Sequence, residues 1–110
     1  MNRIFEEIKQ ERKRCVEKWG NQKHPFPFEL REKYPQFDEQ KIAEHLEIPT
    51  INRSNFLTEL TRIQGDLTWG EILQEEVCEA MLSSDKANIR EELIQIASLC
   101  VAMIQQLDDE

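Results

Sequence analysis

The chain has 110 residues, of which 33% are charged and 39% are hydrophobic, so it is too apolar for a disordered protein. This length suits one domain, which we predict over residues 1–110. A net charge of −8 argues against general nucleic-acid binding. The longest apolar run, residues 93–104, contains polar residues and is too short to span a bilayer, so we expect no membrane segment.

Only three Gly are present, and the four Pro fall between Pro25 and Pro49, which favours long helices on both sides of that segment. The first predicted helix extends from Asn2 to about Lys18 and ends at Trp19-Gly20. Residues 20–37 predict an ordered loop with a short helical turn. Residues 38–47 and 54–64 predict two shorter helices on either side of Pro49.

A stronger helix signal follows, because Thr68 and Glu71 form a capping box at the start of a predicted helix from Trp69 to about Leu82. Residues 83–85 break that helix and offer an N-cap for a last helix over residues 87–107. The short link predicts that these two helices are antiparallel neighbours. The fold class is therefore all-α, and we expect an antiparallel bundle of four to five helices.

The three cysteines, Cys15, Cys78 and Cys100, form no CxxC motif and have no metal-ligand spacing. An odd number in a chain without a signal peptide predicts free thiols and a cytoplasmic location. Cys15 and Cys100 lie at apolar helix positions, so we expect them to be small core residues.

Charge is distributed unevenly along the chain. Residues 1–24 carry seven basic and four acidic side chains, whereas residues 66–110 carry two basic and eleven acidic ones. A basic segment beside an acidic one that binds metal could hold a phosphate-bearing ligand. The alternative is two solvated helix faces of opposite charge.

Several carboxylates of the predicted helix over residues 69–82 lie on its apolar side. A helical wheel places the predicted buried face at six positions: Trp69, Ile72, Leu73, Val77, Ala80 and Met81. Glu76 projects into the middle of this face, Glu79 lies at its edge and Glu75 lies one step further out. An ordinary surface glutamate would lie on the opposite side of the helix.

The last predicted helix repeats this pattern. Its predicted core stripe has seven members: Ile89, Leu93, Ile96, Cys100, Met103, Ile104 and Leu107. Glu92 lies inside the stripe, Gln95 follows one turn later on the same side, and Glu91 points away.

Buried carboxylates without partners are costly, so something must compensate for Glu76, Glu79 and Glu92. A hard divalent cation such as Mg²⁺ would do so with oxygen ligands. Two alternatives stay open at this point: a base such as Arg12 or Lys18 could pair with the acids inside the bundle, or the face could be exposed.

Taken together, these segments resemble the MazG-like family of all-α nucleoside triphosphate pyrophosphohydrolases. The family signature, EExxE followed on the next helix by ExxD, is similar to Glu75-Glu76-Val-Cys-Glu79 and to Glu92-Leu-Ile-Gln95, with Gln in place of Asp. A phage and bacterial subgroup is closer, with KWGxQxHP matched from Lys18 to Pro25 and TWxxILxEEVxEA matched from Thr68 to Ala80. The resemblance covers residues 11–25 and 68–107, roughly half of the chain.

The resemblance implies a Mg²⁺ site (with Mn²⁺ as a substitute) formed by Glu76, Glu79 and Glu92, with Gln95 as a weaker, uncharged fourth ligand. It implies that a nucleoside triphosphate is cut to a monophosphate and pyrophosphate, for control of the nucleotide pool. Glu75 could orient the attacking water or bind a second ion.

Three residues of the first predicted helix would contact substrate in this interpretation. Arg12 and Lys18 could contact phosphates, and Trp19 could stack on the base. Helix packing and ion pairing are the alternative roles of these three side chains.

We also expect a homodimer or tetramer, because Ile94, Val101 and Ala102 extend the apolar surface of the last helix beyond one stripe. The rival functional interpretation is a non-catalytic helical module that binds nucleotide or a protein partner. It draws support from Gln95, which removes one charge from the expected site.

Overall fold

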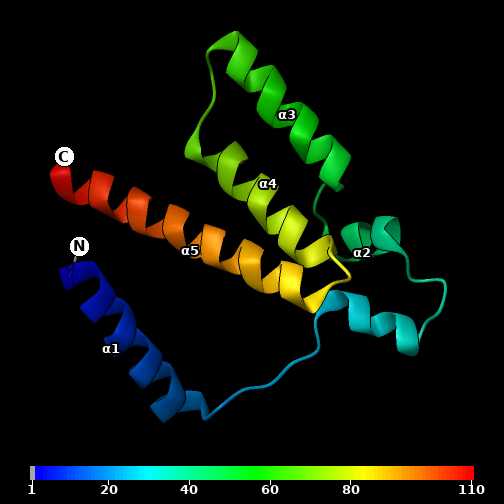
Figure 1. The fold of residues 1–110 in the computed structure, drawn as a ribbon, viewed down its shortest axis with the longest axis horizontal. Helices are drawn as coiled ribbons and strands as arrows, with labels where there is room; N and C mark the ends of the chain where they lie inside the picture. Colours follow the sequence, from blue (N-terminus) through cyan, green and yellow to red (C-terminus); the bar gives the residue numbers. More distant parts are fainter. Residues whose placement is uncertain (1) are drawn as a thin grey trace. The chain divides into compact units, whose positions relative to one another are not determined.

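The computed structural model describes residues 2–110, and every regular element in that part of the chain is a helix (Figure 1). The elements in chain order are α1 (Asn2–Trp19), the 3-10 helix η1 (Pro27–Glu32), α2 (Glu39–Leu46), α3 (Ile51–Gln64), α4 (Trp69–Leu82) and α5 (Lys86–Asp109). The predicted all-α class is confirmed. Within residues 2–110, no helix has the length and apolar character needed to cross a membrane.

Two compact units make up the chain. The central unit is Pro25–Leu99, which contains η1, α2, α3, α4 and the first part of α5. The terminal unit consists of the segment up to His24, with α1, and Cys100–Glu110, with the last turns of α5.

Local signals in the sequence explain where α4 and α5 begin. The Thr68 hydroxyl accepts a hydrogen bond from the Gly70 amide at 3.0 Å, and the Glu71 carboxylate accepts one from the Thr68 amide at 3.1 Å. This is the predicted capping box. The Asp85 carboxylate accepts a hydrogen bond from the Ala87 amide at 2.9 Å and starts α5.

Helix α3 begins at Ile51, three residues before the predicted start. The reason is that Thr50 directly follows Pro49 and acts as the N-cap, with its hydroxyl accepting a hydrogen bond from the Arg53 amide at 3.2 Å. The helix ends where Gly65 adopts a φ of 77°, a left-handed conformation that glycine adopts without a steric penalty.

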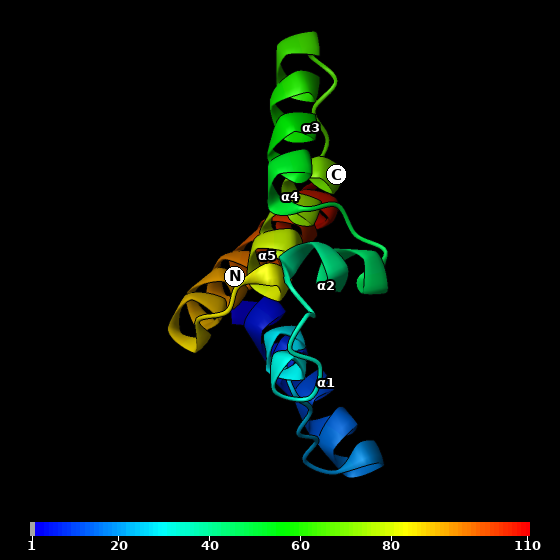
Figure 2. The ribbon, with the colours of Figure 1, turned by 90° about the vertical axis from the view of Figure 1, so that its right-hand side faces the viewer.

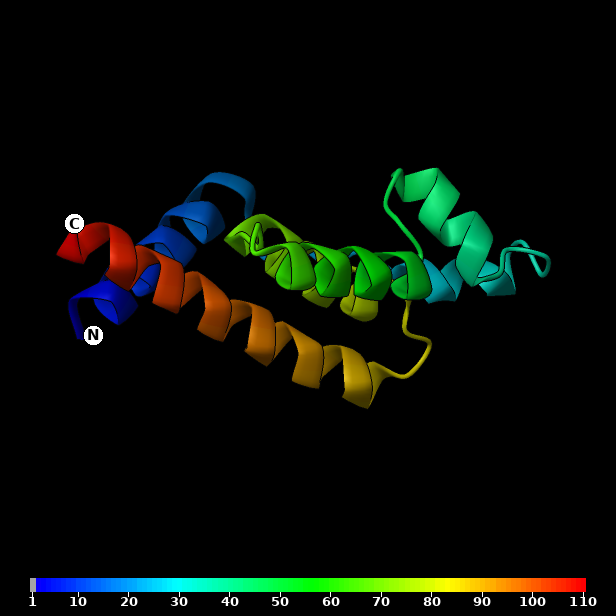
Figure 3. The ribbon, with the colours of Figure 1, turned by 90° about the horizontal axis from the view of Figure 1, so that it is seen from above.

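Helix α4 is the centre of the central unit. It packs against α3, α2 and η1, and α5 runs back in the opposite direction (Figures 1 and 3). The C-terminal half of α4 contributes Cys78 and Leu82 to a core cluster with Ile42 and Ala43 of α2.

The buried face of α4 differs in part from the sequence prediction. Ala80 is buried as expected, but Trp69 remains 36% exposed, while Cys78 and Leu82 are buried although no stripe included them. The physical reason is that α2 and α3 cover a second side of α4, which a single apolar stripe does not reveal. Cys78, rather than Cys15 or Cys100, is the fully buried cysteine.

The stripe predicted for α5 also needs a correction. Val101, expected outside the stripe, is buried within the terminal unit, which also buries Ile4 of α1. Ile94 is exposed, in agreement with the apolar surface predicted outside the core stripe of the last helix. Leu107 was predicted to belong to that core stripe, but it is 69% exposed.

Candidate metal centre

Three carboxylates meet between α4 and α5 inside the central unit. Glu76 and Glu79 lie one turn apart on α4, and Glu92 projects from α5. One oxygen from each of these side chains lies within 4.8 Å of the other two. Among residues 2–110 this is the one group of three or more His, Cys, Asp or Glu side chains with ligand atoms so close together.

The three carboxylates have the same charge, and no basic side chain of the central unit pairs with them. Glu76 Oε2 and Glu92 Oε2 are both buried and have no hydrogen-bond partner among the described residues. None of the ion pairs in the described chain includes Glu76, Glu79 or Glu92. No base of the central unit pairs with the cluster, and two buried oxygens remain without a donor among the residues of that unit.

Electrostatics at the cluster favour the neutral acid in the absence of a cation. Burial raises the pKa of Glu76 to about 7, helped by the hydrogen bond that its protonated form shares with the Glu92 carboxyl and by the charges of Glu79, Glu92 and Glu75. Burial, together with the charges of Glu92 and Glu75, also raises the pKa of Glu79. A bound cation would reverse this preference, because it favours the ionised form of each ligand.

The donor set fits a hard divalent ion. All three ligand atoms are carboxylate oxygens, which suit Mg²⁺, Mn²⁺ and Ca²⁺ and are poor ligands for soft metals. Opposite ligands of a Mg²⁺ ion lie about 4.2 Å apart, since each bond is about 2.1 Å long. Adjacent ligands of the same ion lie about 3.0 Å apart, and at most one pair among three ligands can be opposite. The three carboxylate oxygens, all within 4.8 Å of one another, are grouped closely enough to surround one ion.

The two remaining candidates on these helices occupy different positions. Glu75 is half-buried beside the cluster, and its charge contributes to the raised pKa values of Glu76 and Glu79. Gln95 is exposed. The structure thus places Glu75 close enough to act on the cluster electrostatically, whereas Gln95 has no observed link to it.

Arg12, Lys18 and Trp19 belong to the terminal unit, where all three are exposed on α1. The Lys18 ammonium lies 4.9 Å from the centre of the Trp19 ring, in a cation–π arrangement. Their assignment as substrate contacts stays a prediction.

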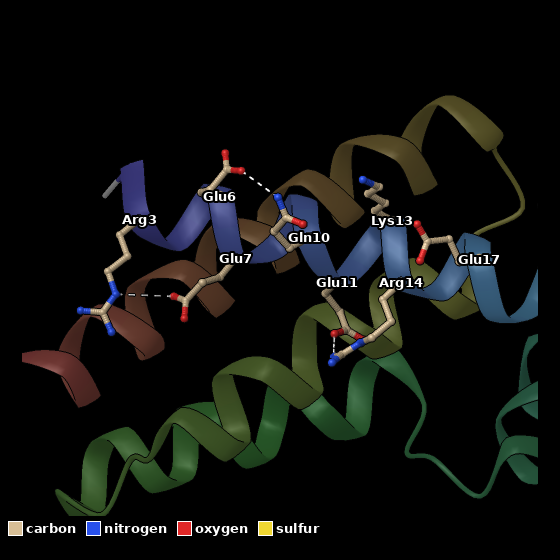
Figure 4. A pocket seen from close by; sticks show the side chains of 8 residues that line it. All are labelled: Arg3, Glu6, Glu7, Gln10, Glu11, Lys13, Arg14 and Glu17. Carbon is tan, nitrogen blue, oxygen red and sulfur yellow. Dashed lines mark hydrogen bonds and ion pairs between the residues drawn. The ribbon is translucent and has the colours of Figure 1, made fainter.

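One face of α1 carries a shallow pocket of about 720 Å³, whose charges are largely paired along the helix (Figure 4). Arg3 pairs with Glu7, Arg14 pairs with Glu11, and Gln10 donates a hydrogen bond to Glu6. Four glutamates and three cationic side chains line this pocket. It therefore carries no net positive charge with which to attract a phosphate.

Comparison of the chain with models of known protein families, with curated proteins and with solved structures gives no match.

Proposed function

We propose that the central unit binds a divalent cation, Mg²⁺ or Mn²⁺, through Glu76, Glu79 and Glu92. The observation that carries this proposal is the pair of buried oxygens, Glu76 Oε2 and Glu92 Oε2, that have no partner in the described chain. A structural carboxylate cluster would be expected to contain a base or to lie in solvent. Among the residues of the central unit, no base pairs with this cluster, and Glu76 Oε2 and Glu92 Oε2 are buried.

The proposed activity is the Mg²⁺-dependent hydrolysis of a nucleoside triphosphate to the monophosphate and pyrophosphate. Its support is the resemblance of the EExxE segment and the flanking motifs to MazG-like pyrophosphohydrolases, together with the meeting of Glu76, Glu79 and Glu92. The finer fold that we propose is likewise the antiparallel helical bundle of that family, assembled as a homodimer or tetramer in the cytoplasm.

The side chains have distinct roles in this proposal. Glu76, Glu79 and Glu92 would hold the ion, which when bound neutralises phosphate charge and activates water. Glu75, at the margin of the cluster, would orient the attacking water with its carboxylate. Arg12 and Lys18 would contact phosphates, and Trp19 would stack on the base.

A non-catalytic nucleotide-binding or protein-binding module remains the second candidate. The observation that favours it is Gln95, which is exposed and uncharged where the related motif carries an aspartate. Such a module would retain nucleotide or partner binding without turnover.

A panel of standard and modified nucleoside triphosphates, incubated with the pure protein and Mg²⁺ or Mn²⁺, tests the proposed activity. Release of monophosphate and pyrophosphate in equal amounts is the expected result. Glu75→Gln should retain metal binding and lose most turnover, whereas Glu91→Gln, an exposed change on α5, should affect neither. Metal binding without hydrolysis of any nucleotide would favour the module, and an absence of metal binding would contradict both parts of the proposal.

A further inference from the structure

Helix α3 has the reverse of the polarity expected of a helix on the surface of a domain. Its buried side, against α4, carries the hydroxyl residues Ser54 and Thr58, which are 1% and 4% exposed. Its outer side carries Phe56, Leu60 and Ile63, which are 55%, 37% and 75% exposed. A surface helix normally buries its apolar stripe and exposes its polar side.

The polar side of α3 is suited to close packing. The Ser54 hydroxyl donates to the Ile51 carbonyl at 2.9 Å, and the Thr58 hydroxyl donates to the Ser54 carbonyl at 3.0 Å. Both donors are thereby satisfied inside the structure. The inverted polarity consequently does not leave the hydroxyls of Ser54 and Thr58 unpaired, and no element of the central unit covers the outer face of α3.

The outer residues form one continuous stripe. Phe56, Leu60 and Ile63 follow each other at intervals of four and three residues, which places them on one face of the helix over about 10 Å. Within the central unit, α4 is the one helix that packs closely against α3. The far end of α3 points away from α2 (Figure 2). Nothing within the central unit therefore covers the stripe.

The order of residues along this stripe makes it complementary to a second copy of itself. Phe56 and Ile63 are placed symmetrically about a point between Glu59 and Leu60. Arg53, near the start of α3, and Asp66, just beyond its end, are symmetric about the same point, and both are exposed. The Arg53 guanidinium also lies 5.4 Å from the centre of the Phe56 ring and so extends the same face.

We propose that this outer face of α3 is a homodimer surface, on which two copies pack antiparallel around a two-fold axis beside Leu60. Phe56 of each copy then meets Ile63 of the other, and Arg53 of each copy lies near Asp66 of the other. Such isologous pairing is the commonest symmetry of soluble oligomers. The surface does not depend on the proposed hydrolysis, because none of its residues belongs to the metal centre.

The size of the stripe sets the expected strength of the dimer. A standard interface buries about 800 Å² on each partner, more than three side chains supply. The apolar stripe would form the centre of the interface, and the Arg53 and Asp66 pairs would lie at its rim. The dimer should accordingly dissociate on dilution.

Analytical ultracentrifugation of the full chain over a range of concentrations tests this surface. The wild-type protein should show a monomer–dimer equilibrium. Leu60→Asp and Ile63→Asp should each weaken it about 100-fold or more, because each places a desolvated charge in the contact. Leu107→Asp, a matched change at an exposed leucine of α5, should leave the dissociation constant within about threefold of wild type. Circular dichroism would check that each variant is folded.

A charge exchange and a cross-link test the antiparallel register. Arg53→Asp should weaken the dimer, and adding Asp66→Arg in the same chain should restore most of the loss. With Cys15→Ser and Cys100→Ser as background, Leu60→Cys should form a disulfide-linked dimer and Leu107→Cys should not. A chain that is monomeric at every concentration, or a dimer that tolerates both Leu60→Asp and Ile63→Asp, would overturn the proposal. Loss of nucleotide hydrolysis alone would leave it standing.

Discussion

The two sides of α4 bury polar groups in opposite ways. Toward α3, the Thr58 hydroxyl donates to the Ser54 carbonyl, and burial raises the pKa of the Cys78 thiol, so that this side chain stays neutral. Toward α5, Glu76 and Glu92 each bury a carboxylate oxygen that has no partner. A satisfied or neutral buried group can serve packing alone, whereas an unpaired buried carboxylate implies a missing cation or proton.

The largest expected effect comes from removing the central ligand on the α5 side. Glu76→Gln should weaken Mg²⁺ or Mn²⁺ binding about 100-fold or more, since ligands matter at least as much as the groups that orient them. At a metal concentration that raises the melting temperature of the wild type by about 10 °C, the variant should show little change. Glu91→Gln removes the same charge from an exposed position on α5 and should keep the full shift. Equal shifts in both variants would show that the ion binds elsewhere.

The next effect is a pH dependence of stability in the metal-free protein. The pKa of Glu76 is about 7 in the folded chain against an ordinary value of 4.5. The folded state therefore binds a proton more tightly, and its free energy of unfolding should fall as pH rises from about 4.5 through 7. The raised pKa of Glu79 acts in the same direction.

Thermal melts in a chelator across this pH range measure that fall, and Glu76→Gln should flatten it. Added Mg²⁺ should stabilise the wild type most at the upper end of the range, where the ligands are ionised. A melting temperature that rises steadily between pH 4.5 and 7 without metal would contradict the assignment.

A smaller effect is expected on the α3 side. Thr58→Val keeps the shape of the side chain and removes the hydroxyl that donates to the Ser54 carbonyl, so it should cost about 1 kcal/mol of unfolding free energy. Chemical denaturation would measure this cost. The metal-induced shift should be unchanged, because the hydroxyl has a structural role only. A large loss of metal binding in this variant would mean that the two sides of α4 are not independent.

The smallest effect is expected at Gln95. Its side chain is exposed, so Gln95→Ala should change metal affinity by less than about threefold and stability by less than about 0.5 kcal/mol. Isothermal titration with Mn²⁺ would measure the affinity. A tenfold loss of metal affinity would identify Gln95 as a metal ligand. It would then correspond to the aspartate of the related motif.

The local features of the chain were readable from the sequence, because they depend on neighbouring residues. The capping box at Thr68 and the N-cap at Asp85 each act through backbone groups within a few positions. The inward direction of Glu76 also followed from helical periodicity, since one turn of a wheel relates it to its apolar neighbours.

Tertiary packing determined which residues of α4 are buried, and a single apolar stripe could not predict this. Helix α4 is covered on two sides, so Cys78 and Leu82 became core residues while Trp69 stayed partly exposed. The inverted polarity of α3 likewise arises only when its hydroxyl face meets α4. The sequence by itself determined the helices and the direction of their carboxylates, because these depend on local geometry. Only the folded structure determined which carboxylate oxygens are buried without a hydrogen-bond partner, because that depends on residues far apart in the chain.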